Sequence, residues 1–403
     1  MMKAWVHDKS LRNLQGLVKS NEPHKSQTRH MEGKNMVQSR DNNNPTLEQS
    51  PPSFVVVGQP TAGLRFLAEA LPPVMMAAGY HFEPEAEAPR AVLNFIRAEK
   101  PTPYRRKAQA TMVVSFLELP QLPAQPIAAL YPYLVRALSN MLVVYVPGQG
   151  AYFLTLELGQ YHEPEGPRFA ERLFERIHPI TSSMLVVNNH FETDLEPELW
   201  QGDELTEGLR QAGRRLAEWD LLPAAFPIEE ILPPEDLRHV KRLYGIGGLS
   251  YGNLSVRKDQ RRFWMSASGV DKANLREIGR DILLVTDYDP IRNSMRLSVP
   301  PGLEPRRVSV DAIEHWMIYR EHPQVGAIIH VHAWMENISS TQFNYPCGTY
   351  ELACAVAEKV RQAPDPSRAV VGLKNHGLTI TGPSLEDIFE RIEGRLLRQV
   401  PMT

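Results

Sequence analysis

From residue 53 onward, short apolar runs alternate with amphipathic stretches, a pattern that predicts a mixed α/β protein. Runs rich in β-branched residues predict strands, and apolar residues at helical spacing predict helices. The predicted strands cover residues 54–58, 112–117, 141–146, 152–158, 184–187, 251–257, 263–267, 325–332 and 369–371. The predicted helices cover residues 61–70, 127–138, 168–177, 204–219 and 233–244, and a further helix opens at 309–311.

The same pattern divides the chain into three parts. Residues 1–52 are rich in Asn, Gln, Ser, Lys and His and show no periodicity, so they cannot bury enough apolar surface to offset the entropy of ordering. We expect them to form a disordered tail. Residues 53–222 form a predicted smaller α/β domain of unassigned role, and residues 223–403 form a second α/β domain in which motifs are dense.

Composition and charge narrow the class of protein. The chain of 403 residues has 42% hydrophobic and 23% charged side chains, which is ordinary for a globular protein. Its formal net charge of -3 gives no electrostatic reason to expect nucleic acid or an anionic membrane as a partner, so a small-molecule substrate fits better. Two cysteines, Cys347 and Cys354, suggest no disulfide framework, and no apolar run approaches the roughly 20 residues of a membrane span. We therefore expect a cytoplasmic protein.

Two histidines stand at the end of a short, strongly apolar strand. His330 and His332 flank Val331, and because side chains alternate along a strand, both imidazoles point to the same face. His376, where another apolar run ends, could supply a third imidazole, and Gly377 after it allows a sharp exit. Three neutral imidazoles with one open position are the ligand set of a catalytic divalent site, most often zinc. The alternative is that each histidine is an ordinary hydrogen-bonded residue at a strand end.

Polar residues that could hold a substrate precede these histidines. A strand that stops at Ser268-Gly269 exposes backbone N–H groups and a hydroxyl, which can bind an anion, although Ser-Gly is also an ordinary turn. Ser309-Val310-Asp311 opens a helix, where an acid is favoured by the helix dipole alone. One helix and a returning strand separate Asp311 from His330, so this carboxylate could also lie beside the histidines.

Taken together, the motifs of residues 225–403 resemble those of the class II aldolase/adducin family. The matching segments are Gly252-Asn253-Leu254-Ser255-Val256-Arg257, Ser268-Gly269, Ser309-Val310-Asp311, His330-Val331-His332, Gly348-Thr349-Tyr350-Glu351-Leu352 and Asn375-His376-Gly377 with Gly382. The resemblance implies an α/β/α layered domain around a largely antiparallel sheet, assembled as a homo-oligomer, usually a tetramer. It also implies the ligand sets, which are His330, His332 and His376 for zinc or another divalent metal, and Asn253, Ser268, Gly269 and Ser309 for the substrate phosphate.

The resemblance implies an activity as well. A divalent-metal-dependent lyase of aldolase type, or an epimerase, would act on a small sugar or hydroxy-carbonyl compound through an enediolate that the metal stabilises. Asp311 would be the catalytic residue that moves the proton. Two other classes stay open, namely a non-catalytic adducin-like scaffold and a different metal chemistry on the same fold, such as an iron oxygenase or a decarboxylase.

Three features depart from the family pattern. Val310 stands where a second serine is expected, which removes one phosphate donor and predicts weaker phosphate binding, unless the cation of Lys272 compensates. The stretch between His332 and His376 is shorter than in the sugar-phosphate aldolases. Residues 53–222 are not part of the enzyme pattern at all.

Overall fold

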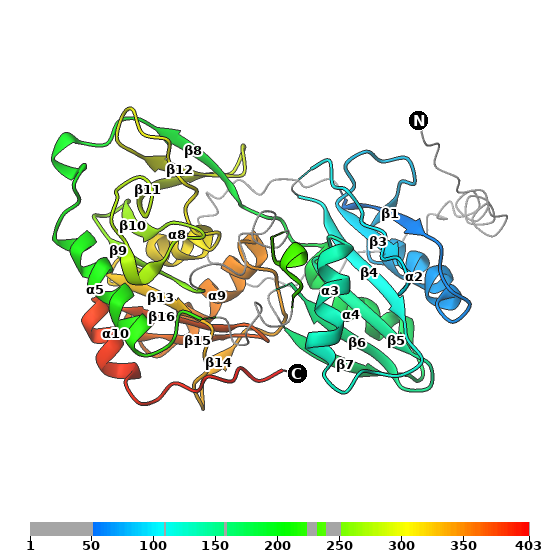
Figure 1. Ribbon diagram of the computed structural model, residues 1–403. Helices are drawn as coiled ribbons and strands as arrows, with labels where there is room; N and C mark the ends of the chain where they lie inside the picture. The colour runs from blue at the N-terminus through cyan, green and yellow to red at the C-terminus, as the bar shows by residue number, and fades with distance from the viewer. Residues whose placement is uncertain (1–50, 109, 157–158, 224–231, 239–250, 403) are drawn as a thin grey trace, which may run out of the picture. The chain divides into compact units, whose positions relative to one another are not determined.

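A computed structural model of the protein describes residues 51–402 except 109, 157–158, 224–231 and 239–250. The tail predicted for residues 1–52 lies outside the described residues, apart from its last two positions. The helix predicted for 233–244 lies outside them from residue 239 onward. The described part is a mixed α/β structure with two sheets, which confirms the predicted fold class (Figure 1).

The first sheet is mixed and is covered by helices on both faces. Its strands are β1 (Ser53–Gly58), β2 (His81–Phe82), β3 (Ala91–Phe95), β4 (Met112–Glu118), β5 (Met141–Val146), β6 (Gly150–Thr155) and β7 (Gln160–Pro164), in the order β2-β1-β3-β4-β5-β6-β7. Pairing is parallel from β2 to β5 and antiparallel from β5 to β7. Helices α2 (Arg65–Ala77) and α4 (Phe169–Thr181) share one buried cluster with this sheet, and α3 (Pro126–Arg136) shares another.

The second sheet is largely antiparallel, as the resemblance implies. Its strands are β8 (Asn188–Glu192), β9 (Asn253–Arg257), β10 (Phe263–Ser266), β11 (Ile282–Asp289), β12 (Ser294–Ser298), β13 (Ala327–Val331), β14 (Ser339–Ser340), β15 (Val370–Leu373) and β16 (Gly377–Gly382). Their order is β14-β15-β16-β13-β9-β10-β11-β12-β8, and pairing is parallel at the two ends of the sheet, between β14 and β15 and between β12 and β8.

Helices packed in pairs cover the second sheet (Figure 1). Helix α8 (Ala312–Glu321) packs with α9 (Tyr350–Gln362), and α5 (Glu204–Glu218) packs with α10 (Leu385–Ile392). Ser255 on β9 identifies the face under α8, because its hydroxyl lies 2.7 Å from His315 Nδ1 and 2.9 Å from Tyr319 Oη. Leu254 and Val256, which alternate with Ser255, belong to the opposite face, on which α5 and α10 pack. The domain is therefore layered α/β/α. Short 3₁₀ helices lie at Pro197–Leu199, Lys272–Asn274 and Pro366–Arg368.

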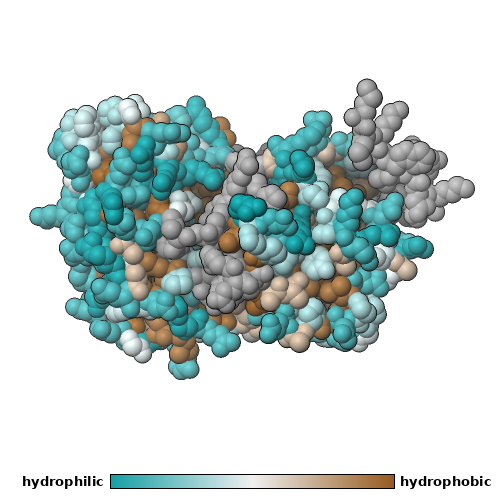
Figure 2. All heavy atoms as spheres, in the orientation of Figure 1, coloured by the Kyte–Doolittle hydropathy of each residue, from teal (hydrophilic) through white to brown (hydrophobic). Residues whose placement is uncertain are grey.

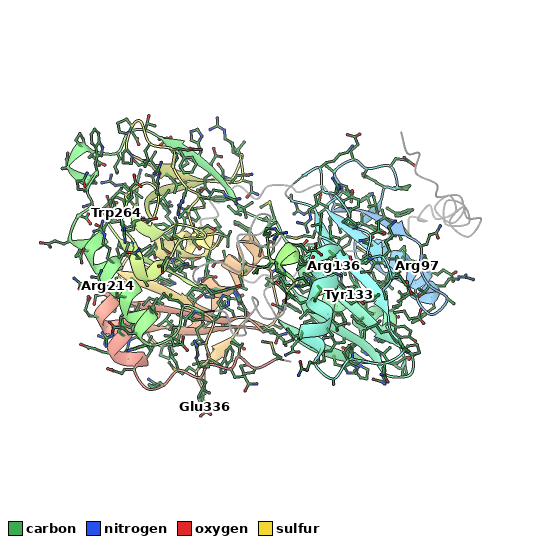
Figure 3. The ribbon with its side chains drawn as sticks, in the orientation of Figure 1. Arg97, Tyr133, Arg136, Arg214, Trp264 and Glu336 are labelled. Carbon is green, nitrogen blue, oxygen red and sulfur yellow. The ribbon has the colours of Figure 1, made fainter. Side chains whose placement is uncertain are left out.

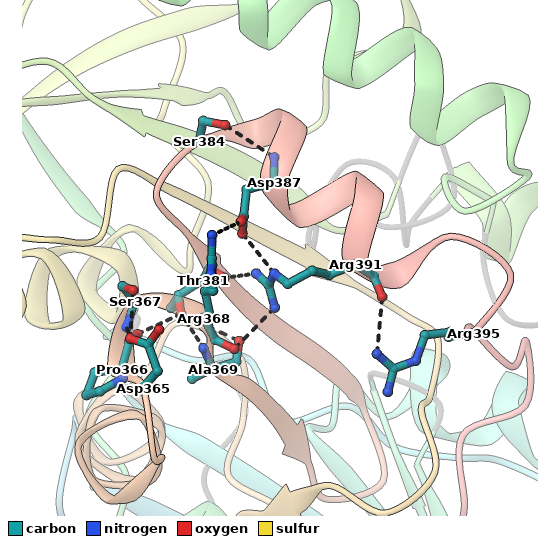
Figure 4. A network of polar contacts seen from close by, with 10 residues as sticks. All are labelled: Asp365, Pro366, Ser367, Arg368, Ala369, Thr381, Ser384, Asp387, Arg391 and Arg395. Atoms are coloured by element: carbon teal, nitrogen blue, oxygen red, sulfur yellow. Dashed lines mark hydrogen bonds and ion pairs between the residues drawn. The ribbon is translucent and has the colours of Figure 1, made fainter.

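Arg391 of α10 connects the end of β16 to Arg368 and Asp387 through hydrogen bonds (Figure 4). Arg391 on α10 donates to the carbonyl oxygens of Thr381, at 2.5 Å, and Arg368, at 3.1 Å. Its Nε also lies 2.8 Å from Asp387 Oδ2, and Arg368 lies 2.7 Å from the other oxygen of that carboxylate. The network holds the end of β16, the strand that begins directly after His376.

The surface and the core separate clearly by polarity. Hydrophilic side chains dominate the face shown in Figure 2, with smaller hydrophobic areas between them. The largest fully buried side chain is Trp264, whose indole Nε1 donates to Asp203 Oδ2 at 3.1 Å (labelled in Figure 3).

Within the described part of the chain, no helix combines the length and the apolar character that crossing a membrane requires.

Two predicted elements differ from the structure. The strand predicted at 184–187 is wrong, since only Leu185 forms an isolated bridge, with Thr349, and the strand that follows is β8. Val186 is apolar because it packs into the core of the second sheet, while its N–H donates to the carbonyl oxygen of Gly348. Helix α2 starts four residues later than predicted, and buried Leu67, Leu71 and Met75, spaced by four, continue it past two prolines to Ala77.

The cores of the two sheets do not divide where the sequence suggests. β8 pairs with β12, and Leu209 and Leu216 of α5 are buried in the cluster of the second sheet. In the other direction, Leu232 is buried in the cluster of α3, and Arg136 (Figure 3) lies 2.8 Å from Asp236. The boundary between 53–222 and 223–403 stays a prediction, and the packing indicates that residues 186–222 contribute to the second core.

Candidate metal centre

The centre begins with His330 and His332 at the carboxyl end of β13. This strand lies between β9 and β16, and His330 pairs with Asn253 on one side and with Thr379 on the other. Val331 is buried in the core. The rings of His330 and His332 lie on the other face, with centroids 5.1 Å apart, as side-chain alternation predicts.

His376 completes a group of three imidazoles. Its ring centroid lies 4.8 Å from that of His330 and 4.7 Å from that of His332. One ligand nitrogen of each histidine lies within 4.8 Å of the other two, a spacing that could hold a metal ion. His330 and His376 are buried and His332 is partly exposed, so the group has one side through which a small molecule could enter.

A hydrogen bond sets the tautomer of His330, and burial sets the charge state of all three rings. His330 Nδ1 lies 2.9 Å from the carbonyl oxygen of Leu378, so Nδ1 carries the proton and Nε2 presents a lone pair. That Nε2 is buried and has no hydrogen-bond partner in the structure. Burial lowers the pKa of His330 and holds the pKa of His332 and of His376 well below the usual range, so all three rings are neutral near pH 7. Neutral imidazoles around a buried, unsatisfied lone pair fit a divalent metal.

Two glycines allow the strands to approach closely at this point. A Cβ on Gly252 would lie 2.3 Å from the carbonyl oxygen of His330, and one on Gly377 would lie 2.3 Å from that of Val331. The prediction that Gly377 makes the sharp exit is wrong. The left-handed backbone belongs to Asn375, with φ 57°, and Gly377 is instead the first residue of β16.

Asp311 returns to the histidines along the predicted path. Its side chain does not cap helix α8. Instead, Asn253 Nδ2 donates to one carboxylate oxygen at 2.7 Å, and the N–H of Gly348 donates to the other at 3.1 Å. Because Asn253 is the cross-strand partner of His330, the buried carboxylate is held beside the three histidines.

Two more buried ionisable side chains surround Asp311. Lys272 is 2% exposed, and burial lowers its pKa to about 8 against the attraction of Asp311. Glu314 is also 2% exposed, and burial together with the charge of Asp311 raises its pKa to about 8. Thr379 Oγ1 donates to Glu314 Oε1 at 2.5 Å, which ties α8 to the strand beside His330. The sequence signal for Glu314 is an acid about one helical turn after Asp311, in a helix whose other first-turn residues, Ala312 and Ile313, are apolar.

The structure brings the Ser268-Gly269 turn next to the segment that contains Ser309, whose N–H donates to the carbonyl oxygen of Ser266 at 3.2 Å. The N–H of Ser268 donates to the carbonyl oxygen of Arg307 at 2.9 Å, so the Ser268-Gly269 turn lies against the segment that leads to Ser309. A Cβ built on Gly269 would meet nothing within 4 Å, so this turn borders open space. Val310, by contrast, lies close to Gly348. A Cβ added to Gly348 would lie 2.8 Å from the Cβ of Val310. Weaker phosphate binding stays a prediction.

The sequence of this region matches a known family. Residues 238–343 match the model of the class II aldolase and adducin N-terminal domain. The match includes Asn253, Asp311, His330 and His332 and ends before His376. The chain therefore carries a class II aldolase/adducin domain.

Individual relatives cover unequal parts of the chain. A methylthioribulose-1-phosphate dehydratase of Serratia proteamaculans is 37% identical over 82 residues, which is 20% of this chain and 34% of that enzyme. A methylthioribulose-1-phosphate dehydratase of Citrobacter koseri is 27% identical over 172 residues, which is 36% of this chain and 78% of that enzyme. A solved L-fuculose 1-phosphate aldolase is 21% identical, with a TM-score of 0.33 over 48% of this chain and 81% of that structure.

Proposed function

We propose that the chain is a divalent-metal-dependent lyase that acts on a small ketose or a related hydroxy-carbonyl compound. His330, His332 and His376 would hold the ion, and we propose Zn²⁺, since three imidazoles and one open position are typical of catalytic zinc. Asp311 would move the proton. The observation that carries the proposal is the unsatisfied Nε2 of His330, buried among neutral imidazoles beside a carboxylate.

Each group would contribute a separate part of the chemistry. The ion, when bound, would be a Lewis acid for the carbonyl oxygen, on which negative charge develops. Asp311, oriented by Asn253 and Gly348, would remove the proton from the carbon next to the carbonyl. The C–H electron pair would then form a double bond while the C–O bond on the next carbon breaks, and the leaving hydroxyl would take the proton from Asp311 and depart as water. The buried Lys272 adds a positive charge near Asp311.

Of the two reaction types open to such a lyase, we propose loss of water and not cleavage of a C–C bond. Both reactions begin with negative charge on the same carbonyl oxygen, so the ion and its ligands serve either one. The relatives in Serratia proteamaculans and Citrobacter koseri are named as dehydratases, and the first is 37% identical over its aligned part. The first partner that we propose is the small-molecule substrate. By the family resemblance, we also propose that the chain assembles with further copies of itself, and light scattering would measure the number of copies.

A direct assay tests the proposal. The full chain, loaded with Zn²⁺, should convert methylthioribulose 1-phosphate to a product that mass spectrometry shows to have lost one water. L-Fuculose 1-phosphate, assayed in parallel for aldehyde release, reports C–C cleavage. Bound zinc without turnover of either compound would favour the non-catalytic scaffold instead.

Replacement of the proposed proton carrier gives the first mutational prediction. Asp311→Asn should retain the metal and lower kcat by about 100-fold or more, because general acid–base catalysis contributes roughly 10²–10⁴-fold. The new amide can accept a hydrogen bond through one atom only, so a moderate loss of stability should accompany the change. The matched control is Glu336→Gln, an exposed acid (labelled in Figure 3), which should leave kcat unchanged. If Asp311→Asn lost its metal, Asp311 would be a ligand and not the base.

A further inference from the structure

A cysteine lies directly beside the three histidines. Cys347 Sγ is 3.2 Å from Nε2 of His376 and 3.8 Å from Nδ1 of the same ring. That Nε2 is also 3.1 Å from Nε2 of His332. With metal–nitrogen bonds of about 2.0–2.1 Å and metal–sulfur bonds of about 2.3 Å, neighbouring ligand atoms of a tetrahedral zinc lie roughly 3.3–3.6 Å apart. The thiol is therefore one ligand spacing away from His376.

The backbone around Cys347 is fixed on both sides, so the side-chain torsion is its main freedom. The N–H of Gly348 donates to Asp311, and the carbonyl oxygen of Gly348 accepts from Val186 at 2.8 Å. Thr349 Oγ1 donates to the carbonyl oxygen of Pro346 at 2.7 Å. The sulfur stands outside the group in which the three histidine nitrogens lie within 4.8 Å of one another. Rotation about the Cα–Cβ bond can bring it nearer to that group.

An independent observation indicates that an ion belongs next to this thiol. His330 Nε2 is buried in the same group and has no hydrogen-bond partner, as described above. Three imidazoles leave one position of a tetrahedral ion open. A thiol in reach of that position is a soft ligand, which favours zinc or cobalt over magnesium or manganese.

We propose that Cys347 is the fourth ligand of the metal in the absence of substrate, and that it leaves when the substrate binds. This inference rests on the proposed metal site and adds a resting state that is closed by sulfur. The thiol loses its proton to solvent when the metal–sulfur bond forms. It regains a proton when the substrate oxygen takes its place, so the exchange needs no oxidant or reductant.

Cobalt substitution tests the inference in the full chain. Co²⁺ bound by a thiolate absorbs in the near ultraviolet through sulfur-to-metal charge transfer, whereas tetrahedral Co²⁺ absorbs in the visible whatever its ligands. The Co²⁺ protein should show both bands. Cys347→Ser and Cys347→Ala should lose the ultraviolet band and keep the visible one. Cys354→Ser, which changes the other and exposed cysteine, is the matched control and should keep both.

The possible failures are distinguishable. A visible band without the ultraviolet band in the unmodified protein would overturn the role of Cys347 and leave the three-histidine site standing. An ultraviolet band that persists in Cys347→Ser, or that disappears only in Cys354→Ser, would overturn it too. Absence of both bands in the unmodified protein, with no cobalt retained after gel filtration, would overturn the metal site and this inference together.

Discussion

His330 illustrates how backbone surroundings can assign a role to one side chain. The Nδ1–H of His330 donates to the carbonyl oxygen of Leu378, and burial keeps the ring neutral, so the lone pair of Nε2 faces the other two rings. The His-x-His spacing was enough to predict that His330 and His332 share a face, because alternation along a strand is a local rule. The tautomer was not predictable, since it depends on a carbonyl group 48 positions away in the sequence.

Removal of one imidazole should release the metal. His332→Ala leaves two protein nitrogens, and since loss of an outer-shell partner alone weakens metal sites by about 10–100-fold, loss of a direct ligand should weaken this one further. Elemental analysis after dialysis should find about one zinc per chain in the unmodified protein and almost none in the variant. His162→Ala, at an exposed position of β7, is the control and should bind metal normally. Full occupancy in His332→Ala would refute the ligand assignment.

At the scale of elements, the predicted strands omit several that the structure contains, both apolar ones, such as β3 and β11, and polar ones, such as β8 and β16. β9, β10 and β13 were predicted because they contain apolar or β-branched runs. β16 (Gly377–Gly382) is fully buried yet contains Thr379 and Thr381, whose hydroxyls are hydrogen-bonded inside the protein. Its polar residues are satisfied by partners distant in sequence, so no local pattern identifies it as a core strand.

The contact between α8 and β16 gives a prediction for pH. The pKa of Glu314 rises from 4.5 to about 8 on folding, so the folded protein keeps a proton that the unfolded chain releases. The stabilisation from this group is complete below about pH 4.5 and is lost as the pH rises through about 8. Glu314→Gln keeps an acceptor for Thr379 and cannot ionise. In metal-free protein, the thermal midpoint of the variant relative to that of the unmodified protein should therefore rise as the pH increases from about 5 to about 8.

A control and a contrary outcome complete this test. Glu358→Gln, on an exposed position of α9, should follow the unmodified protein at every pH. A difference between Glu314→Gln and the unmodified protein that stays constant across the range would mean that Glu314 is ionised at all these pH values in the folded state, contrary to the effect of its burial.

At the scale of the whole molecule, the sequence predicts two α/β regions but not how segments are shared between them. β8 is polar, and its pairing partner β12 lies about a hundred residues further along the chain, so no local pattern identifies it as a strand. The amphipathic pattern of α5 shows that one side is buried, but not against which sheet. Long-range pairing decides to which sheet β8 belongs, and packing decides which sheet α5 covers. The sequence shows neither, and the boundary predicted from it therefore falls at residue 222, after both elements.

The last prediction concerns which fragment folds alone. A fragment of residues 224–403 lacks β8, which leaves β12 as an open sheet edge, and lacks α5, whose Leu209, Ala212 and Leu216 cover the core. It should be expressed mostly as insoluble protein. A fragment of residues 183–403 restores both elements, and its soluble yield should be several-fold higher, with about one zinc per chain. Equal solubility of the two fragments would show that β8 and α5 are dispensable and that the domain boundary at residue 222 is the physical one.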